Sequence, residues 1–405
     1  MKRIITFFIA MAAGLSAFAA NEVTVKGPDG KLTVTVGIEA GKPYYSVDYA
    51  GTAILEKSPL GLVSTMGNYD SSMEFVSQAE EPVKKVYTQD RIKKSFINYN
   101  ANKLVYKMKN ARGNELSVIF QVSDNDVAFR YELAATRGRY SDVILSEATG
   151  FDFPSTTTTF LTPQADPMTG FARTKPSYEE TYCYDGGIAD KSRYGCGYTF
   201  PALFHVGQDH WALVSETGVT SQYVGSHLSD PTADGLYTIA FPDEREINGW
   251  GSTGAAVALP ALTPWRTITV GDSLKPIVET TVPFDVVDPL YKPSQTYKFG
   301  KSTWSWIMWG DRATCFEDQI LYIDFAAAMG WEYCLVDALW DTQIGRDKIA
   351  ELSAYAQSKG VGLFLWYNSN GQWNDAPQGP RGCLSNSIAR KQEMKWLKEI
   401  GVKGL

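Results

Sequence analysis

Histidine, cysteine and basic residues are all in short supply in this chain. The three histidines, His205, His210 and His227, do not have the spacing of zinc ligands, which argues against a catalytic zinc. Lysine and arginine total 38 against 45 aspartates and glutamates, a formal net charge of −7, so a nucleic-acid partner is not expected. With 44% hydrophobic residues, the 405-residue chain can bury a sizeable core and is long enough for two domains.

Long apolar runs are also rare, and the one that occurs stands at the N-terminus. Lys2 and Arg3 precede an apolar run over residues 4–15, and Ala17-Phe18-Ala19 supplies the small residues of a cleavage site, which predicts a signal peptide over residues 1–19. The run is shorter than the ~20 residues that span a bilayer, and no later segment is apolar enough. We therefore expect an exported, periplasmic protein without a transmembrane segment, and association with the outer membrane stays open. Loss of Lys2 and Arg3 leaves 36 basic against 45 acidic residues, a net charge of −9.

The five cysteines are few for an exported chain of this length. Cys183 and Cys196 bracket a glycine-bearing loop, and their spacing leaves both a disulfide and two separate thiols open. Cys315 and Cys334 lie in apolar stretches and are predicted to be core residues.

The chain changes character near residue 290. Residues 21–282 carry short alternating runs typical of β-strands, among them residues 22–26, 32–38, 104–108, 116–122 and 127–133. Turn residues such as Pro28-Asp29-Gly30 separate these runs, and many short strands over this length predict a large β-sandwich. Three prolines, Pro283, Pro289 and Pro293, then predict a linker over residues 283–300.

Residues 301–405 alternate between strand-like and helical patterns. The predicted strands are residues 301–306, 333–337, 361–367 and the beginning of a fourth at 402–405, and the predicted helices are residues 316–329, 347–359 and 387–400. Each helix is followed by a glycine, Gly330, Gly360 or Gly401, in the position that favours a left-handed conformation. Repeated βα units form either an open sheet or a closed barrel, and periodicity does not separate the two. A barrel needs ~250 residues, so this one would be incomplete, broken off as a fourth strand begins.

Aromatic and polar residues gather where the predicted strands end. The first predicted strand ends in Trp306 and is followed by Trp309, and the second ends in Asp337 and is followed by Trp340 and Asp341. The third ends in Trp366, Tyr367 and Asn368. In barrels the active site lies at these carboxyl ends. Indole rings pack on the apolar faces of sugars while carboxylates and amides bond their hydroxyls, so the pattern favours a glycan site. The alternative is that the tryptophans only fill the barrel mouth and Asp337 caps a turn.

Carboxylates are too few here for a complete hydrolytic site. Glycoside hydrolysis usually needs two carboxyl groups on either side of the bond, and Asp337 and Asp341 are the only ones at these strand ends. Two other classes therefore stay open: a non-catalytic glycan-binding protein, and a sugar-modifying enzyme such as a mutarotase. The second needs an acid/base pair within the sandwich, which the few histidines disfavour.

Several stretches together resemble glycoside hydrolase family 97, which includes outer-membrane-associated α-glucosidases and α-galactosidases of Bacteroides-type bacteria. The resemblance covers essentially the whole mature chain, and the stretches that carry it are Ser58-Pro59-Leu60-Gly61-Leu62, Val127-Ala128-Phe129-Arg130-Tyr131, Thr263-Pro264-Trp265-Arg266, Ser302-Thr303-Trp304-Ser305-Trp306, Tyr322-Ile323-Asp324-Phe325-Ala326, and Leu335-Val336-Asp337 with Trp340. It implies an N-terminal β-super-sandwich, a (β/α)₈ barrel of TIM type and a smaller C-terminal β domain.

The resemblance also implies site residues and a calcium ion near the substrate. Trp306 and Asp337 match positions that contact the sugar in the family. One acidic side chain of the sandwich reaches the calcium there, and we place it at Glu179 ahead of Glu180, with an exposed acidic loop as the alternative. The other calcium ligands would lie outside this chain, so calcium binding by these residues alone is expected to be weak.

The family has two mechanistic branches, and Asn368 separates them. Inverting members carry a catalytic glutamate at the end of the third strand, where this chain has Asn368, and an amide cannot activate water. Retaining members use an aspartate on the fourth strand, which would follow Leu405, and the acid/base glutamate would come later still. We therefore expect an exo-acting, retaining, α-galactosidase-like hydrolase of oligosaccharides, with an inverting α-glucosidase as the alternative. The 405 residues alone are expected to be inactive.

Overall fold

The computed structural model describes residues 21–168, 180–247, 251–369 and 376–405. The predicted signal peptide, residues 1–19, lies outside the described residues. The chain divides into two compact units: the first comprises residues up to Gln164, Glu180–Pro242 and Thr253–Asp288, and the second consists mainly of Pro289–Leu405. Each unit has its own hydrophobic core.

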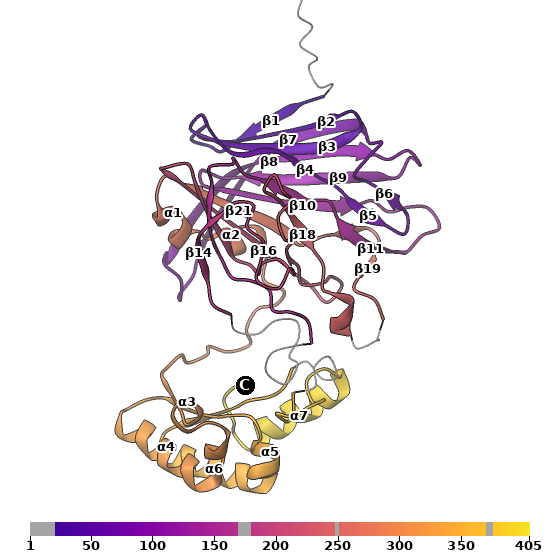
Figure 1. Cartoon of the computed structure of the whole chain (residues 1–405). Coiled ribbons are helices and arrows are strands. Elements are labelled where there is room, and N and C mark those ends of the chain that lie inside the picture. Colours follow the sequence, from indigo (N-terminus) through magenta and orange to yellow (C-terminus); the bar gives the residue numbers. More distant parts are fainter. Residues whose placement is uncertain (1–20, 169–179, 248–250, 370–375) are drawn as a thin grey trace, which may run out of the picture. The chain divides into compact units, whose positions relative to one another are not determined.

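The first unit is built from antiparallel sheets, as its alternating sequence predicts (Figure 1). One four-stranded sheet has the order β1-β2-β3-β4, with strands Val23–Lys26, Leu32–Glu39, Lys42–Tyr49 and Thr52–Pro59. The largest sheet has the order β14-β13-β15-β16-β21-β10-β9-β8-β7, and β20 pairs with β10. Its strands are Cys183–Gly187, Thr158–Leu161, Ala202–Val206, His210–Thr217, Trp265–Gly271, Asp126–Leu133, Glu115–Val122, Phe96–Lys109, Glu74–Thr88 and, for β20, Ala261–Leu262.

Two smaller sheets complete this unit. Their orders are β19-β11-β5-β6, with strands Ala255–Ala258, Ser141–Glu147, Leu62–Ser64 and Gly67–Asn68, and β12-β18-β17, with strands Gly150–Asp152, Leu236–Ala240 and His227–Leu228. All five predicted strands are present: residues 22–26, 32–38, 104–108, 116–122 and 127–133. Four of them match the observed bounds to within one residue at each end, and residues 104–108 lie inside the longer strand β8.

Aromatic side chains join two of the sheets into a sandwich. Tyr45 of β3 is fully buried, and its ring lies 6.0 Å from Phe120 of β9 and 5.0 Å from Phe129 of β10. Phe120 and Phe129 stack on each other with ring centroids 5.2 Å apart. Such pairs contribute ~0.5–1.5 kcal/mol each beyond the area that they bury. The core of the first unit therefore lies between facing sheets.

A network of charged side chains is buried within the same unit. Arg266 of β21 is 1% exposed and donates to Glu147 of β11 and Glu216 of β16, as well as to Ser226 Oγ at 2.8 Å. The Glu147 side chain is 0% exposed and also accepts a hydrogen bond from the Tyr223 hydroxyl at 2.5 Å. Burial, together with the neighbouring carboxylate, raises the pKa of Tyr223 well above its usual value. This network ties three strands of the sandwich together.

The boundary between the units falls inside the predicted linker, residues 283–300, a few residues after its start. Pro283 stands in the first turn of a short helix, α2 (Val282–Val286), where its missing N–H costs no hydrogen bond. Val282 and Val286 pack on Trp265 of the sandwich, next to α1 (Leu274–Glu279). The start of the predicted linker, residues 283–286, therefore belongs to the first unit, and the boundary lies at Asp288–Pro289.

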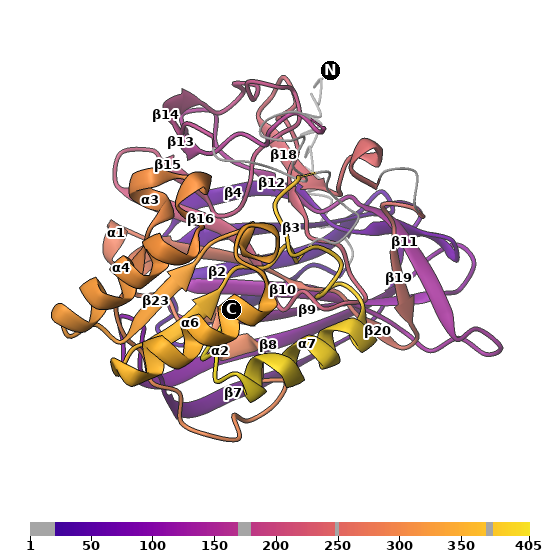
Figure 2. The same ribbon diagram turned by 90° about the horizontal axis from the view of Figure 1, so that it is seen from below.

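The second unit is a parallel sheet with helices, in the order that the sequence predicts. The strands are β22 (Ser302–Trp304), β23 (Tyr333–Val336) and β24 (Gly362–Leu365), and the longer helices are α4 (Phe316–Ala328), α6 (Arg346–Ser358) and α7 (Ser387–Glu399). The three helices lie side by side in Figure 2 and bury apolar residues against β23 and β24. Gly330, Gly360 and Gly401 follow the helices with φ of +66°, +75° and +80°, the left-handed conformation that was expected there.

Two features of this unit extend the sequence prediction. Gly404 forms a parallel bridge with Phe364, and the Lys403 N–H donates to the Leu363 carbonyl at 2.9 Å, so the fourth strand does begin next to β24. Short helices follow two of the strands: α3 (Trp306–Trp309) with the 3₁₀ turn Asp311–Ala313, and α5 (Trp340–Gln343). The first strand therefore ends at Trp304, two residues earlier than predicted.

All five cysteines lie within the described residues, and none forms a disulfide. Cys183 is exposed and Cys334 is buried, whereas Cys315, predicted to be a core residue, is only partly buried. Among the described residues, no helix is long and apolar enough to cross a membrane.

Candidate functional site

The parallel register brings the carboxyl ends of the three strands to one edge of the sheet. Thr303 of β22 pairs with Cys334 of β23, which in turn pairs with Leu363 of β24. The residues that follow each strand therefore emerge from the same edge, where ligands bind in parallel sheets.

Asp337 is the central polar group at this edge. It follows β23, is 6% exposed, and its Oδ2 accepts a hydrogen bond of 2.7 Å from the indole N–H of Trp304. Its Oδ1 accepts a second, of 2.6 Å, from the backbone N–H of Ala338. Each oxygen thus has one internal donor, and the remaining lone pairs can accept hydrogen bonds from a ligand hydroxyl.

Trp306 provides an aromatic surface beside Asp337. Its side chain is 40% exposed, and one ring face is covered by Trp304, with centroids 5.5 Å apart and ring planes 17° from parallel. Its indole N–H donates to Asp311 Oδ1 at 2.8 Å. The structure therefore brings two of the predicted site residues, Trp306 and Asp337, together through Trp304.

Trp304 and Asp311 were missed by the sequence reasoning. Strand alternation could have found Trp304, because residues two apart in a strand point to the same face and Trp306 was already a candidate. Asp311 lies in a 3₁₀ turn after α3, and no local pattern pairs it with an indole five residues earlier.

Trp340 lies in the core of the second unit, not at the sugar-facing position that we expected. It is 0% exposed, and its N–H donates to the Trp366 carbonyl at 2.9 Å. Its ring packs on Tyr367 and Trp396, with centroids 5.5 Å and 6.0 Å away. The ring therefore holds the ends of β23 and β24 together from within.

Asn368 and Trp366 lie at the end of the third strand. Asn368 is 4% exposed, and its N–H donates to the Pro380 carbonyl at 3.1 Å, while its side-chain amide lies 3.4 Å from the Gln378 carbonyl. Asn368 therefore holds the segment around Pro380 against the strand end. Trp366 is partly exposed, and its N–H donates to the Val336 carbonyl at 2.9 Å.

An ion pair between a buried carboxylate and a half-exposed arginine supports this region. Glu393 of α7 is 8% exposed, forms an ion pair with Arg346 of α6, and accepts a hydrogen bond of 3.0 Å from the Tyr367 hydroxyl. Burial, reinforced by Glu393, raises the pKa of Tyr367 above its usual value, so the hydroxyl stays a donor. These groups are turned toward the helices and give the strand end a rigid base.

Asp341 is the other carboxylate near the strand ends. It lies in α5 close to Gly379, where a side chain on residue 379 would come within 2.6 Å of Asp341 Oδ2. Among the described residues, Asp341 Oδ1 is buried without a hydrogen-bond partner. The backbone of Gly379 accepts a hydrogen bond of 2.9 Å from the Leu339 N–H, so Asp341 lies beneath the segment that also contacts Asn368.

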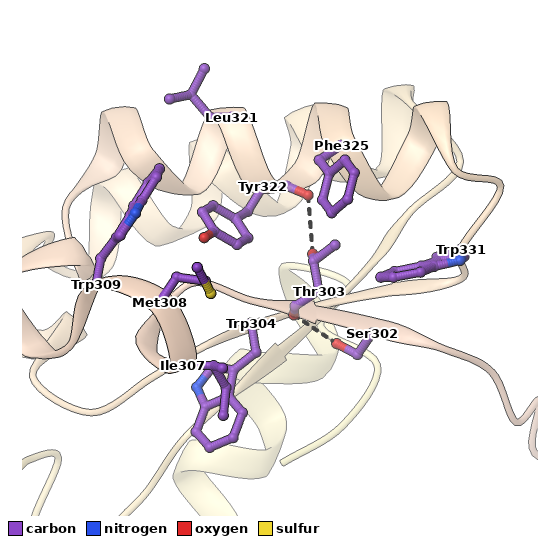
Figure 3. Close-up of a pocket in the computed structure, with 10 residues that line it drawn as sticks. All are labelled: Ser302, Thr303, Trp304, Ile307, Met308, Trp309, Leu321, Tyr322, Phe325 and Trp331. Carbon is purple, nitrogen blue, oxygen red and sulfur yellow. Dashed lines mark hydrogen bonds between the residues drawn. The ribbon is translucent and has the colours of Figure 1, made fainter.

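An apolar pocket of about 610 Å³ lies between β22 and α4 (Figure 3). Ten residues line it: Ser302, Thr303, Trp304, Ile307, Met308, Trp309, Leu321, Tyr322, Phe325 and Trp331. Two of its three hydroxyls are engaged, since Thr303 Oγ1 donates to the Tyr322 carbonyl at 3.0 Å and Ser302 Oγ to the Thr303 carbonyl at 3.0 Å. A polyol needs free polar partners, so this pocket suits apolar packing and the strand-end edge suits a sugar.

The two residues predicted to reach a calcium ion are Glu179 and Glu180. Glu179 lies outside the described residues. Glu180 accepts hydrogen bonds from the Tyr194 hydroxyl at 3.2 and 3.3 Å and lies 4.0 Å from Arg193. No group of three or more Asp, Glu, His or Cys side chains suitable for a metal occurs within the part of the chain that the structure describes. Calcium binding stays a prediction.

Three comparisons place the chain among known proteins. The family profile "Glycosyl-hydrolase 97 N-terminal" matches residues 25–289. A β-arabinopyranosidase of known crystal structure is 54% identical in sequence, with a TM-score of 0.90. The similarity covers 94% of this chain and 61% of that one. A family 97 enzyme from Pseudoalteromonas sp. strain K8, solved in complex with panose, is 19% identical with a TM-score of 0.74. The similarity covers 94% of this chain and 58% of that one, and at this identity it shows a shared fold.

One curated relative is named for a glycosidase activity. A probable retaining α-galactosidase of Streptomyces bingchenggensis (strain BCW-1) is 26% identical over 401 residues, 94% of this chain and 56% of that protein. The chain thus spans a little over half the length of this relative.

Proposed function

Because the chain belongs to glycoside hydrolase family 97, we propose that it is part of an exo-acting enzyme that removes a terminal sugar from oligosaccharides with retention of configuration. The observation that carries this is the strand-end edge, where the exposed face of Trp306 lies beside the Asp337 carboxylate through their shared neighbour Trp304. An aromatic face with an anionic acceptor beside it suits one pyranose ring, whose apolar C–H face packs on the indole while a hydroxyl bonds the carboxylate.

The sugar that we propose has the galacto configuration. A β-L-arabinopyranoside has the hydroxyl arrangement of an α-D-galactopyranoside and lacks only the hydroxymethyl group on the ring. The β-arabinopyranosidase neighbour, taken to act on the L-sugar, and the α-galactosidase relative therefore name substrates of one shape. The 54% identity to the former favours the arabinopyranoside, and the α-galactoside is the second candidate.

Retention is proposed because Asn368 stands where an inverting enzyme of the family would carry its base. Asn368 is 4% exposed and engaged with the segment around Pro380, and an amide has no useful basicity. An α-glucosidase with inversion is correspondingly disfavoured.

We further propose that the parallel sheet is part of a (β/α)₈ barrel. Gly404 already pairs with Phe364 beyond β24, and on the other side β22 is an edge strand beside the apolar pocket. Exposed apolar side chains such as Ile307 (61%) and Leu321 (57%) at that pocket are typical of a surface that another element covers.

An export signal over residues 1–19 gives the proposed enzyme a periplasmic location.

The 405 residues alone are proposed to be inactive. Asp337 and Asp311, the carboxylates beside Trp306 and Trp304, are each engaged by an indole N–H, whereas hydrolysis needs a nucleophile and an acid/base on either side of the glycosidic bond.

Hydrolysis by the product of the complete reading frame that contains these residues tests the proposal. Rates on nitrophenyl β-L-arabinopyranoside, α-D-galactopyranoside and α-D-glucopyranoside should fall in that order, with the glucoside slower by at least about 100-fold, since a site built around one hydroxyl arrangement rejects the other. Preference for the glucoside would contradict the proposed sugar. Binding of these sugars without turnover would instead support a non-catalytic glycan-binding protein.

A further inference from the structure

The two tryptophans at the strand-end edge share one arrangement. Trp304 and Trp306 are stacked 17° from parallel, and each indole N–H donates to a carboxylate, Trp304 to Asp337 at 2.7 Å and Trp306 to Asp311 at 2.8 Å. An N–H that donates to a carboxylate forms one of the stronger hydrogen bonds in proteins and has a narrow preferred direction. Both rings therefore have a fixed plane and a fixed edge direction.

Trp304 lies on the face of β22 that is turned away from α4. Figure 3 shows Thr303 pointing toward α4, where its hydroxyl bonds the Tyr322 carbonyl, and Trp304 pointing to the opposite side. Successive side chains of a strand alternate in this way. Trp304 thus reaches Asp337 on the neighbouring strand while its ring supports the covered face of Trp306.

The turn that carries Asp311 is itself fixed from inside the unit. Gln319 of α4 is 0% exposed, and its amide donates to Ser305 Oγ at 3.0 Å and to the Ala313 carbonyl at 2.5 Å. Ser305 precedes α3 and Ala313 ends the 3₁₀ turn, so one buried amide holds both ends of the segment that contains Trp306 and Asp311. Asp311 is therefore a rigid anchor for the Trp306 ring.

We propose that Trp304 and Asp311 are positioning residues of the sugar site: Trp304 orients the Asp337 carboxylate, and Asp311 fixes the ring plane of Trp306 before a sugar arrives. This rests on the proposed function for the ligand, and it adds two residues that need not touch the sugar. Presetting a side chain removes the cost of immobilising it on binding, which is worth about 2- to 10-fold in affinity for each side chain.

Four variants of the 405-residue chain test this. Asp311→Ala removes the acceptor for the Trp306 N–H, whereas Asp311→Asn keeps an acceptor oxygen in the same place. Trp304→Phe keeps an aromatic ring and removes the donor to Asp337. Trp309→Phe is the matched control, because Trp309 is also 40% exposed but packs edge-on against Tyr322 of α4.

The first readout needs no sugar. With 5-fluorotryptophan incorporated and the Trp306 fluorine resonance assigned by Trp306→Phe, Asp311→Ala should narrow that resonance as the ring gains motion. Asp311→Asn and Trp309→Phe should leave its width unchanged. An unchanged width in Asp311→Ala would overturn the role of Asp311, and a resonance as narrow in Asp311→Asn as in Asp311→Ala would do the same.

The second readout is affinity for methyl β-L-arabinopyranoside and methyl α-D-galactopyranoside, followed by the shift of the same resonance. Asp311→Ala and Trp304→Phe should each weaken binding about 2- to 10-fold, with Asp311→Asn and Trp309→Phe within about twofold of the unmutated chain. Unaltered affinity in Trp304→Phe would overturn its role. If the unmutated chain binds neither glycoside, the sugar site does not form from these residues alone and the roles proposed here for Trp304 and Asp311 are overturned. The proposed function is decided separately, by the hydrolysis assay on the product of the complete reading frame.

Discussion

Replacing Arg266 should cost the first unit a large part of its stability. Arg266 is 1% exposed and is the cation shared by Glu147, with a side chain 0% exposed, and Glu216, with a side chain 14% exposed. In Arg266→Ala the Glu147 carboxylate keeps hydrogen bonds from Tyr223 and from Thr149 Oγ1 at 3.1 Å but loses its counter-charge.

The magnitude follows from that burial. Breaking a buried ion pair by removing one partner costs ~3–5 kcal/mol, and the two remaining donors to Glu147 place this case near ~3 kcal/mol. Because each 1.4 kcal/mol is a factor of ten, the ratio of folded to unfolded first unit should fall by about two orders of magnitude. The stability of Arg266→Lys should lie between those of the unmutated chain and Arg266→Ala, because one ammonium group keeps the positive charge but cannot replace the planar set of guanidinium donors.

Urea unfolding followed by far-ultraviolet circular dichroism measures this change. Lys103→Ala is the matched control, because Lys103 pairs with Glu81 at 2.8 Å on the surface of β8, where both partners are in contact with solvent. Its unfolding midpoint should stay within error of the unmutated chain. A loss of under ~1 kcal/mol in Arg266→Ala would refute the reasoning that Glu147 depends on this cation.

Three further predictions follow from other parts of the molecule. Burial raises the pKa of Asp126, whose Oδ1 accepts hydrogen bonds from Thr269 at 2.6 Å and Thr280 at 2.7 Å. The folded state then favours the protonated carboxyl. The contribution of Asp126 to stability is therefore present below the pKa of the group in the unfolded chain, and it is lost as the pH rises through the pKa in the folded state. Asp126→Asn should remove this loss of stability when the free energy of unfolding is measured by urea titration at pH 4 to 7. If the free energy of unfolding changes with pH equally in the two proteins, the prediction is contradicted. The apolar pocket should bind anilinonaphthalene sulfonate, and Leu321→Asp in its exposed wall should lower the bound-dye fluorescence; an unchanged signal would show that the dye sits elsewhere. The purified 405-residue chain should hydrolyse none of the three nitrophenyl glycosides named above, and robust turnover would disprove its proposed inactivity.

Local pattern was enough for most elements of the second unit. The helices predicted at residues 316–329, 347–359 and 387–400 match α4, α6 and α7 to within one residue, because amphipathic spacing and a following glycine mark both length and end. The short helices α3 and α5 were not predicted, since four residues are too few to show a helical period.

The candidate site was harder to predict, because tertiary packing decides what an aromatic residue at a strand end does. Trp306 and Trp340 carried the same signal, yet Trp306 is 40% exposed and Trp340 is fully buried. The difference arises from α7, whose Trp396 stacks on Trp340, and nothing near residue 340 in sequence shows this. Arg266 and Glu147 likewise lie 119 residues apart, so no local pattern could pair them.

The anomeric form of the first-released sugar tests the central proposal most directly. Proton NMR of the complete gene product acting on a β-L-arabinopyranoside or an α-D-galactopyranoside should show, before mutarotation, β-arabinose or α-galactose, the configuration of the substrate. Release of the opposite anomer would show that water attacks directly despite Asn368, and would contradict the retaining assignment.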